Sequence, residues 1–265
     1  MSSQTVVPLD DGAHTTLELW GDHGPVMLCV HGMTSSRKSW ARVAQKYSDR
    51  FRVYAYDQRG HGDSADVPGP MTLHRSVKDL ANVIAAIAMP INVLMGHSWG
   101  GAIVLLGGQR FDIGRVVAID PMLRQGTDIW YAEFLGELEQ LFSLDGDARD
   151  AAVRDAYADW NVLDRESKVY ALHAMGRRTL EGLRDENPAQ TWDLHEELTD
   201  YPKPVLFAMA DPSQSIVTRE DAAFVERSVG ANATFAQFPG ASHSLQRTDF
   251  ERFIEILDNF LASTQ

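Results

Sequence analysis

Short apolar runs alternate along most of the chain with segments in which apolar residues recur at helical spacing. The apolar runs predict β-strands, and the clearest helical spacing follows Thr72, a suitable N-cap residue. The predicted strands are Thr15–Trp20, Val26–Val30, Arg52–Tyr56, Ile91–Met95, Arg115–Ile119, Pro204–Met209 and Ala233–Phe238. The predicted helices are Ser39–Tyr47, Thr72–Ala88, Gly100–Gln109, Arg219–Val229 and Thr248–Leu261. This alternation predicts an α/β fold with a mostly parallel central sheet covered by helices on both faces.

The alternation stops between about Leu123 and Tyr201, where the pattern is helical throughout. Helices are predicted there at Ile129–Leu141, Ala148–Trp160, Arg165–Arg178 and Pro188–Leu198. A compact α/β core needs only a short connection between the strands on either side, so we interpret this stretch as a helical cap insertion. Such folds bind ligands at the carboxyl ends of their strands, which the cap would cover. We therefore expect a core of residues 1–122 and 202–265 and a cap of residues 123–201.

The composition argues against several classes of function. A net charge of −13 at pH 7 is unlike that of proteins that bind nucleic acid or anionic membranes, which need a basic surface. The single cysteine, Cys29, lies inside a predicted strand, so no internal disulfide can form and a reducing compartment is expected. No apolar run is long enough for a transmembrane helix, and no signal peptide is recognisable. We expect a cytoplasmic protein that acts on a small molecule.

A candidate nucleophile lies at residues 96–100, which read Gly-His-Ser-Trp-Gly between an apolar run and a predicted helix. A serine hydroxyl becomes a useful nucleophile when it is held exposed, beside a base and beside donors for an oxyanion. A sharp turn from strand to helix gives that exposure at the cost of strained backbone angles, and the small residues two positions before and after Ser98 make room for it. This context indicates that Ser98 lies on a nucleophile elbow.

Two further motifs follow predicted strands. His-Gly-Met at 31–33 follows the strand at Val26–Val30, and Asp-Gln-Arg-Gly-His-Gly-Asp-Ser at 57–64 follows the strand at Arg52–Tyr56. With these motifs and the one at Ser98, the chain resembles the α/β-hydrolase family from about residue 15 to its C-terminus. The resemblance implies a capped serine hydrolase, similar to esterases, with a catalytic triad.

The resemblance also indicates the base of that triad. His243 ends the sequence Gly-Ala-Ser-His at 240–243, in the turn between the last predicted strand and the final predicted helix. In the α/β-hydrolase family the catalytic histidine occupies this turn, so His243 is the expected base. The other histidines lie in early polar turns, in the glycine-containing motifs or on predicted helices.

Two aspartates compete for the acid of the triad. Most members of the family place it after the seventh strand in a Gly-x-x-Asp pattern, but Ser213 occupies that position here and Asp211 comes two residues earlier. Some members instead carry the acid after the sixth strand, where this chain has Asp120. Asp120 is the preferred assignment, because it ends a strand near the elbow, and Asp211 is kept as the alternative. Either carboxylate would orient His243 and stabilise its protonated form.

The oxyanion hole is expected to consist of two backbone N–H groups, those of Met33 and Trp99. The turn at Ser98 lacks the Gly-x-Gly fingerprint of a dinucleotide site, and no cluster of histidine, cysteine and aspartate has the spacing of metal ligands. We therefore expect neither a cofactor nor a metal.

The residue at the elbow narrows the reaction. Haloalkane dehalogenases and epoxide hydrolases attack with an aspartate there, whereas Ser98 indicates acyl transfer through an acyl-serine. The leading hypothesis is a carboxylesterase or lactonase that cleaves an ester or lactone bond of a small, largely apolar substrate. A carbon–carbon bond hydrolase or an amidase would use the same residues. A non-catalytic ligand receptor on the same fold is the alternative from a different class of function.

Overall fold

The computed structural model describes residues 2–125, 129–187 and 192–263. Its strands form one eight-stranded sheet in the order β1-β2-β4-β3-β5-β6-β7-β8. The strands are β1 (Ser2–Pro8), β2 (His14–Trp20), β3 (Val26–Val30), β4 (Arg52–Tyr56), β5 (Ile91–His97), β6 (Ile113–Ile119), β7 (Val205–Met209) and β8 (Ala233–Gln237). Neighbours from β4 to β8 in this order pair parallel, while β1 with β2 and β2 with β4 pair antiparallel. The prediction of a mostly parallel sheet is confirmed.

The edge strand β1 is the part of the sheet that the sequence pattern does not predict. Six of its seven residues are exposed, and only Val7 is buried. An edge strand with one solvated face carries no continuous apolar run, and the alternation in Ser2–Pro8 is too polar to stand out. The other seven strands lie where they are expected, within one or two residues.

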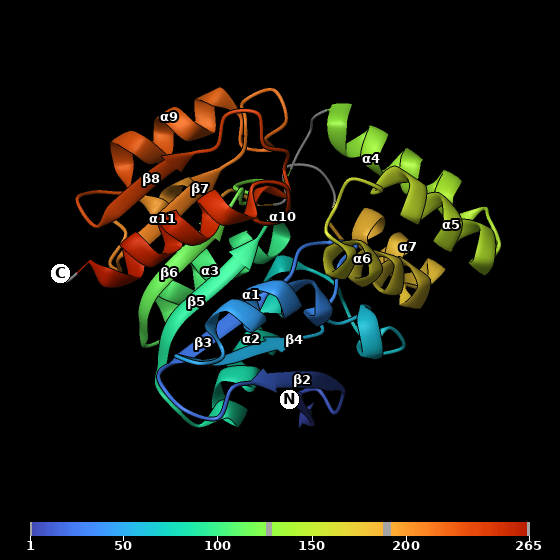
Figure 1. Cartoon of the computed structure of the whole chain (residues 1–265), viewed down its shortest axis with the longest axis horizontal. Helices are drawn as coiled ribbons and strands as arrows, with labels where there is room; N and C mark the ends of the chain where they lie inside the picture. Colours follow the sequence, from blue (N-terminus) through green and yellow to red (C-terminus); the bar gives the residue numbers. More distant parts are fainter. Residues whose placement is uncertain (1, 126–128, 188–191, 264–265) are drawn as a thin grey trace.

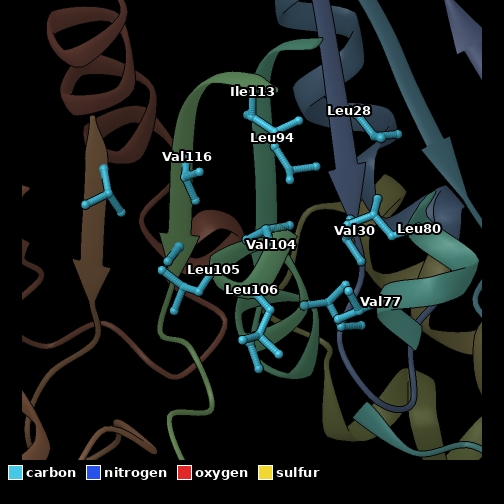
Figure 2. Packing of buried hydrophobic residues seen from close by; sticks show 14 of the residues in the cluster. Leu28, Val30, Val77, Leu80, Leu94, Val104, Leu105, Leu106, Ile113 and Val116 are labelled. Atoms are coloured by element: carbon cyan, nitrogen blue, oxygen red, sulfur yellow. The ribbon is translucent and has the colours of Figure 1, made fainter. Parts of the chain in front are cut away.

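Helices cover both faces of the sheet, as predicted. The core helices are α1 (Ala41–Tyr47), α2 (Leu73–Ile87), α3 (Trp99–Arg110), α9 (Arg219–Ser228), α10 (Leu245–Thr248) and α11 (Phe250–Ala262). Because successive side chains of a strand point to opposite faces, Leu28 and Val30 pack with α2 and α3, whereas Met27 and Cys29 pack with α1 and α11. Figure 2 shows the first cluster, in which side chains of α2 and α3 lie against β3, β5 and β6.

A second group of helices lies along the chain between β6 and β7. These helices are α4 (Ile129–Phe142), α5 (Gly146–Ala156), α6 (Val162–Ala174), α7 (Arg177–Asp185) and the single turn α8 (His195–Leu198). In Figure 1, α4 to α7 (yellow-green to gold) lie together at one side of the sheet. They share a small apolar core of their own, which includes Leu138, Val153, Val169, Leu172 and Leu180. None of the helices in the described ranges is long and apolar enough to cross a membrane.

The ends of several helices differ from the predicted ones. The helix predicted at Ala148–Trp160 ends at Ala156, because Asn161 starts the next helix by accepting a hydrogen bond from the Leu163 N–H at 2.9 Å. The helix predicted at Arg165–Arg178 is divided between α6 and α7, with Gly176 in an extended conformation at the junction.

Two more predicted helices are shorter than expected. Of the helix predicted at Pro188–Leu198, only α8 is helical in the described residues, and residues 188–191 lie outside them. The final predicted helix is preceded by the separate turn α10, because Asp249 leaves the helical conformation, with φ −131° and ψ 52°.

Candidate active site

Ser98 lies on a strained turn between β5 and α3. Its backbone has φ 57° and ψ −120°, a region that residues with a side chain rarely adopt. The turn fits because the residues two positions before and after Ser98 are glycines. A Cβ on Gly96 would lie 2.2 Å from the carbonyl oxygen of Gly100, and a Cβ on Gly100 would lie 2.2 Å from the carbonyl oxygen of Val30. The structure therefore has the sharp, strained turn from strand to helix that the sequence predicts at Ser98.

His243 and Asp120 form a hydrogen-bonded pair beside this turn. His243 Nδ1 lies 2.7 Å from Asp120 Oδ2, and the Asp120 side chain is fully buried while that of His243 is 30% exposed. Asp120 follows β6 directly and has a positive φ of 39°, which turns its side chain toward the loop after β8 that carries His243. The pairing fixes the neutral imidazole with Nδ1 as the donor and Nε2 as the unprotonated nitrogen.

The remaining acceptor positions of Asp120 are used by the loop after β7. Oδ1 accepts hydrogen bonds from the Ala210 N–H at 3.0 Å and from the Ser215 hydroxyl at 2.6 Å. Oδ2 accepts a further one from the Ile216 N–H at 3.1 Å. A buried carboxylate is stable as an anion when several donors satisfy its oxygens. Ser215 and Ile216 were not predicted from the sequence, and a serine three residues before the Thr218 cap of α9 carries no distinctive signal.

Asp211, the alternative acid, lies elsewhere and serves its own turn. It accepts hydrogen bonds from the Ser213 hydroxyl at 2.6 Å, the Ser213 N–H at 2.9 Å and the Gly240 N–H at 2.8 Å. These bonds, led by that of the Ser213 side chain, lower the pKa of Asp211 to about 2. The structure thus brings Asp120, and not Asp211, into contact with His243.

His97, the residue before Ser98, holds the loop of His243 in place. Its Nε2 donates a hydrogen bond to the carbonyl oxygen of His243 at 2.9 Å, and the two ring centroids are 4.5 Å apart. Burial lowers the pKa of His97 well below its ordinary value, with His243 adding to the shift, so the ring is neutral at pH 7. A neutral, buried ring that is engaged with a backbone carbonyl supports the turn and is poorly placed to transfer protons.

The two backbone donors expected for an oxyanion hole flank Ser98. Trp99 is the first residue of α3, so its N–H has no acceptor within the helix. Met33 follows Gly32, and a Cβ on Gly32 would lie 2.9 Å from the Ser98 Cβ. Gly32 therefore lets the loop at 32–34 approach Ser98 closely.

A cavity of about 510 Å³ opens at this point. The core contributes Ser98, His97 and His243 to its walls. Phe134 of α4 and Tyr157 and Trp160 of the segment after α5 line the other side, so the core and the region between β6 and β7 enclose the site together. Thr34, Ser35, Lys168 and Arg247 also line it, and Glu133 and Glu137 of α4 line the same cavity and are exposed. The wall is thus more polar than the expectation of a largely apolar substrate implies. In the part of the chain that the structure describes, no three histidine, cysteine, aspartate or glutamate side chains gather as metal ligands.

Comparison with known proteins gives consistent matches over nearly the whole chain. Residues 27–256 match the model of the alpha/beta hydrolase family. A 2-(acetamidomethylene)succinate hydrolase from Mesorhizobium japonicum is 28% identical over 260 aligned positions, which cover 90% of this chain and 88% of that protein.

Solved structures share the fold at lower identity. A carboxylesterase from Bacillus subtilis has a TM-score of 0.81 at 18% identity, covering 100% of this chain and 93% of the other. An enol-lactonase from Burkholderia xenovorans has a TM-score of 0.76 at 19% identity, covering 98% of this chain and 100% of the other.

Proposed function

Because the chain belongs to the alpha/beta hydrolase family, a family of enzymes, we propose that it is a serine hydrolase that cleaves an ester or lactone bond of a small substrate through an acyl-serine intermediate. The observation that carries this proposal is the contact of 2.7 Å between His243 and the buried Asp120, in the same site as the strained Ser98. A serine, an oriented imidazole and a buried carboxylate are the parts that acyl transfer requires.

In the first half of the proposed reaction, the Ser98 oxygen attacks the carbonyl carbon while its proton passes to His243 Nε2. The carbonyl electron pair moves onto oxygen, where the N–H groups of Met33 and Trp99 stabilise the negative charge. Collapse of this intermediate breaks the bond to the leaving oxygen, which takes the proton from His243 Nε2. Asp120 keeps the imidazole oriented and stabilises it while it is protonated.

In the second half, water takes the place of the serine. His243 removes a proton from the water, whose oxygen attacks the acyl carbon and forms a second tetrahedral intermediate. Its collapse returns the proton to Ser98 and releases the acid. A lactone gives a hydroxy acid, because both products remain on one molecule.

An activity-based probe tests the proposal directly. A fluorophosphonate should label the protein once, and peptide mass spectrometry should locate the label on Ser98. Ser98→Ala should lose the label while circular dichroism stays unchanged. Absence of labelling on the folded protein, or labelling elsewhere, would reject the proposed nucleophile and favour a ligand receptor.

An amidase is the second candidate, because the relative from Mesorhizobium japonicum is named as a hydrolase of an acetamido compound and aligns over 90% of this chain. The same residues serve an amide if His243 protonates the leaving nitrogen. A panel of matched acyl esters, lactones, amides and β-diketones separates ester, amide and carbon–carbon cleavage by the products.

We further propose that residues 123–201 act as a cap, since α4, the segment after α5, and α6 supply one side of the cavity. A reducing compartment such as the cytoplasm is also part of the proposal, because the single cysteine, Cys29, is a buried free thiol.

A further inference from the structure

Two positively charged side chains, Lys168 and Arg247, enter the cavity beside the loop that follows Met33. Lys168 Nζ of α6 donates hydrogen bonds to the Thr34 carbonyl oxygen at 3.0 Å and to the Thr34 hydroxyl at 2.8 Å. Arg247 Nη2 of α10 donates one to the Ser35 hydroxyl at 3.1 Å. All four side chains line the cavity that also holds Ser98. Both cations therefore lie on the same side of the site, next to the proposed oxyanion hole.

Neither cation is in direct contact with a carboxylate of the described residues. Asp164 is the nearest acidic partner: it is paired with Arg42 at 3.4 Å, and it also interacts at longer range with the charge of Arg247. Arg247 is only 7% exposed, and its Nε donor has no hydrogen-bond partner in the described residues. Burial lowers the pKa of Lys168 to about 7, with Arg247 adding to the shift. Asp164 offsets part of the charge of Arg247, but no carboxylate of the described residues contacts either cation directly, so the pair leaves a positive potential inside the cavity.

A buried guanidinium is costly unless its donors find acceptors. Arg247 offers five N–H donors in a planar fork, of which one has a partner that the structure describes. If Arg247 served only to hold the loop through Ser35, an uncharged hydrogen-bond donor would be sufficient. The planar fork fits a carboxylate in a two-point contact, and the Lys168 ammonium adds a second charge-assisted bond.

We propose that the preferred substrates carry a carboxylate, which Arg247 and Lys168 bind beside the reacting carbonyl group. This inference rests on the proposed function, because it concerns the same cavity and assumes that Ser98 is the nucleophile. It replaces the expectation of a largely apolar substrate with that of a small anionic ester, lactone or amide.

The other charged residues of the cavity determine where the carboxylate lies. Glu133 and Glu137 line it from α4 and are exposed, so they repel an anion from that side while water screens their charge. The aromatic rings of Trp160 and Tyr157 lie 4.9 Å from the Arg247 guanidinium and 5.6 Å from the Lys168 ammonium, respectively. The carboxylate of the substrate is thus expected at the side of Thr34 and Ser35. Since the chain as a whole carries a net charge of −13, an anionic substrate depends on these local cations for its attraction to the site.

The test compares two esters of equal size, one of which is anionic and the other neutral. The substrates are monomethyl glutarate, which carries a carboxylate, and methyl 5-amino-5-oxopentanoate, in which an amide replaces it. Methanol release gives kcat/KM for both. We expect the wild-type protein to favour the acid by about 10-fold or more, the size of one or two charge-assisted hydrogen bonds. Lys168→Met and Arg247→Met should each reduce kcat/KM for the acid by about 10-fold or more, mainly through KM, and change that for the amide by less than about 3-fold.

Two controls separate recognition from folding. Arg165→Gln removes a positive charge from the same helix as Lys168 but outside the cavity walls, and should leave the preference unchanged. Arg247→Lys keeps the charge and should retain part of the preference. A preference of the wild-type protein for the amide, or equal losses on both esters in the Met variants, would overturn the inference and leave those cations as supports of the loop.

A readout without turnover covers the case in which neither ester is cleaved. The two esters then compete with the fluorophosphonate for Ser98, and the acid should protect at a concentration about 10-fold lower than the amide. Equal protection, or none by the acid, would overturn the inference while labelling of Ser98 still supports the proposed function. Loss of the label itself would reject the function instead.

Discussion

Asp120 Oδ2 contacts His243 Nδ1 at 2.7 Å, although the two residues are 123 positions apart in the chain. The loop after β7 does not supply this carboxylate. It supplies the Ala210 and Ile216 N–H groups and the Ser215 hydroxyl, which hold Asp120 from the other side. Asp120 and the groups that hold it thus come from the ends of two neighbouring strands, so variants of the two parts are expected to give different results.

The nucleophile is tested by Ser98→Ala. Turnover should fall by about 10⁴-fold or more, because serine and histidine act as one unit. The smaller side chain suits the turn, so circular dichroism and the melting temperature should stay close to those of the wild-type protein. Activity within tenfold of wild type on the best ester would contradict the mechanism.

The two aspartates are separated by a pair of conservative variants. Asp120→Asn should reduce kcat by about 10⁴-fold, as in other serine–histidine–aspartate triads, since an amide favours the wrong tautomer of His243 and carries no charge. Asp211→Asn should cost less than about tenfold, because Asp211 bonds only to its own turn and to Gly240. Both are measured on one substrate with thermal melts alongside. A collapse confined to Asp211→Asn would exclude Asp120 as the acid.

Ser215 is expected to act as a positioning residue. Ser215→Ala removes the hydrogen bond of 2.6 Å to Asp120 Oδ1 and should lower kcat by about 10-fold while KM changes little. Ser215→Thr restores a hydroxyl at the same position and should recover most of the rate. Ser213→Ala, which removes a hydroxyl bonded to Asp211, is the matched control and should leave kcat unchanged. A rise in KM with kcat unchanged would instead assign Ser215 to substrate contact.

The preference for an anionic substrate should depend on pH through Lys168. Its pKa of about 7 means that Lys168 is a cation below that pH and neutral above it. The ratio of kcat/KM for monomethyl glutarate to that for its amide analogue should therefore fall as pH rises through about 7. A bound carboxylate stabilises the ammonium, so the fall should lie at a higher pH in the complex than in the free protein.

The ratio isolates Lys168 from the rest of the site. The same cavity is also lined by Arg247, Glu133, Glu137, Tyr157 and His243, and Asp164 lies on the helix of Lys168. A pH effect that is common to both substrates cancels in the ratio. The fall should disappear in Lys168→Met. A ratio that is flat from pH 6 to 9 in the wild-type protein would show that Arg247 alone carries the charge.

The elbow offers a test of strain and space. Gly100→Ala would place a Cβ 2.2 Å from the backbone oxygen of Val30, which cannot move aside as a side chain could. We expect a loss of about 1–3 kcal/mol in the free energy of unfolding together with loss of activity. Gly136→Ala, on α4 with nothing within 4 Å of the added Cβ, should be neutral or stabilising by up to about 1 kcal/mol. Urea titrations of both variants measure the difference.

Periodicity and motif order were sufficient to predict the sheet, the covering helices and the turn at Ser98. These signals are local: nearly continuous apolar runs at β3 and β5, and the space that Gly96 and Gly100 leave at the turn of Ser98. The exposed strand β1 was not predicted, because an edge strand with a solvated face has few apolar residues. Spacing did not decide between Asp120 and Asp211, because the choice depends on which loop folds toward His243.

The cations of the cavity could not be recognised from the sequence at all. Lys168 lies in a polar helix and Arg247 in a single turn, and both have the appearance of solvated surface charges. Their burial results from the packing of α6 and α10 against the loop at 34–35, which is a property of the tertiary structure alone. Arg247 lies four positions after His243, and this spacing is the only local hint that it lies near the site.

In the part of the chain that the structure describes, the hydrogen bonds of the Asp120 side chain and of His243 run to β5 and to the loops after β6, β7 and β8, and none runs to α4, α5 or α6. The proposed proton path therefore lies outside the segment from α4 to α6, whereas the cavity walls combine that segment with Thr34, Ser35 and Arg247 of the core. Substitutions in α4 to α6 can redirect the enzyme toward new acids, esters or amides without rebuilding its chemistry. Natural or laboratory evolution can therefore change the substrate preference through α4 to α6 while the residues around Ser98, Asp120 and His243 stay constant.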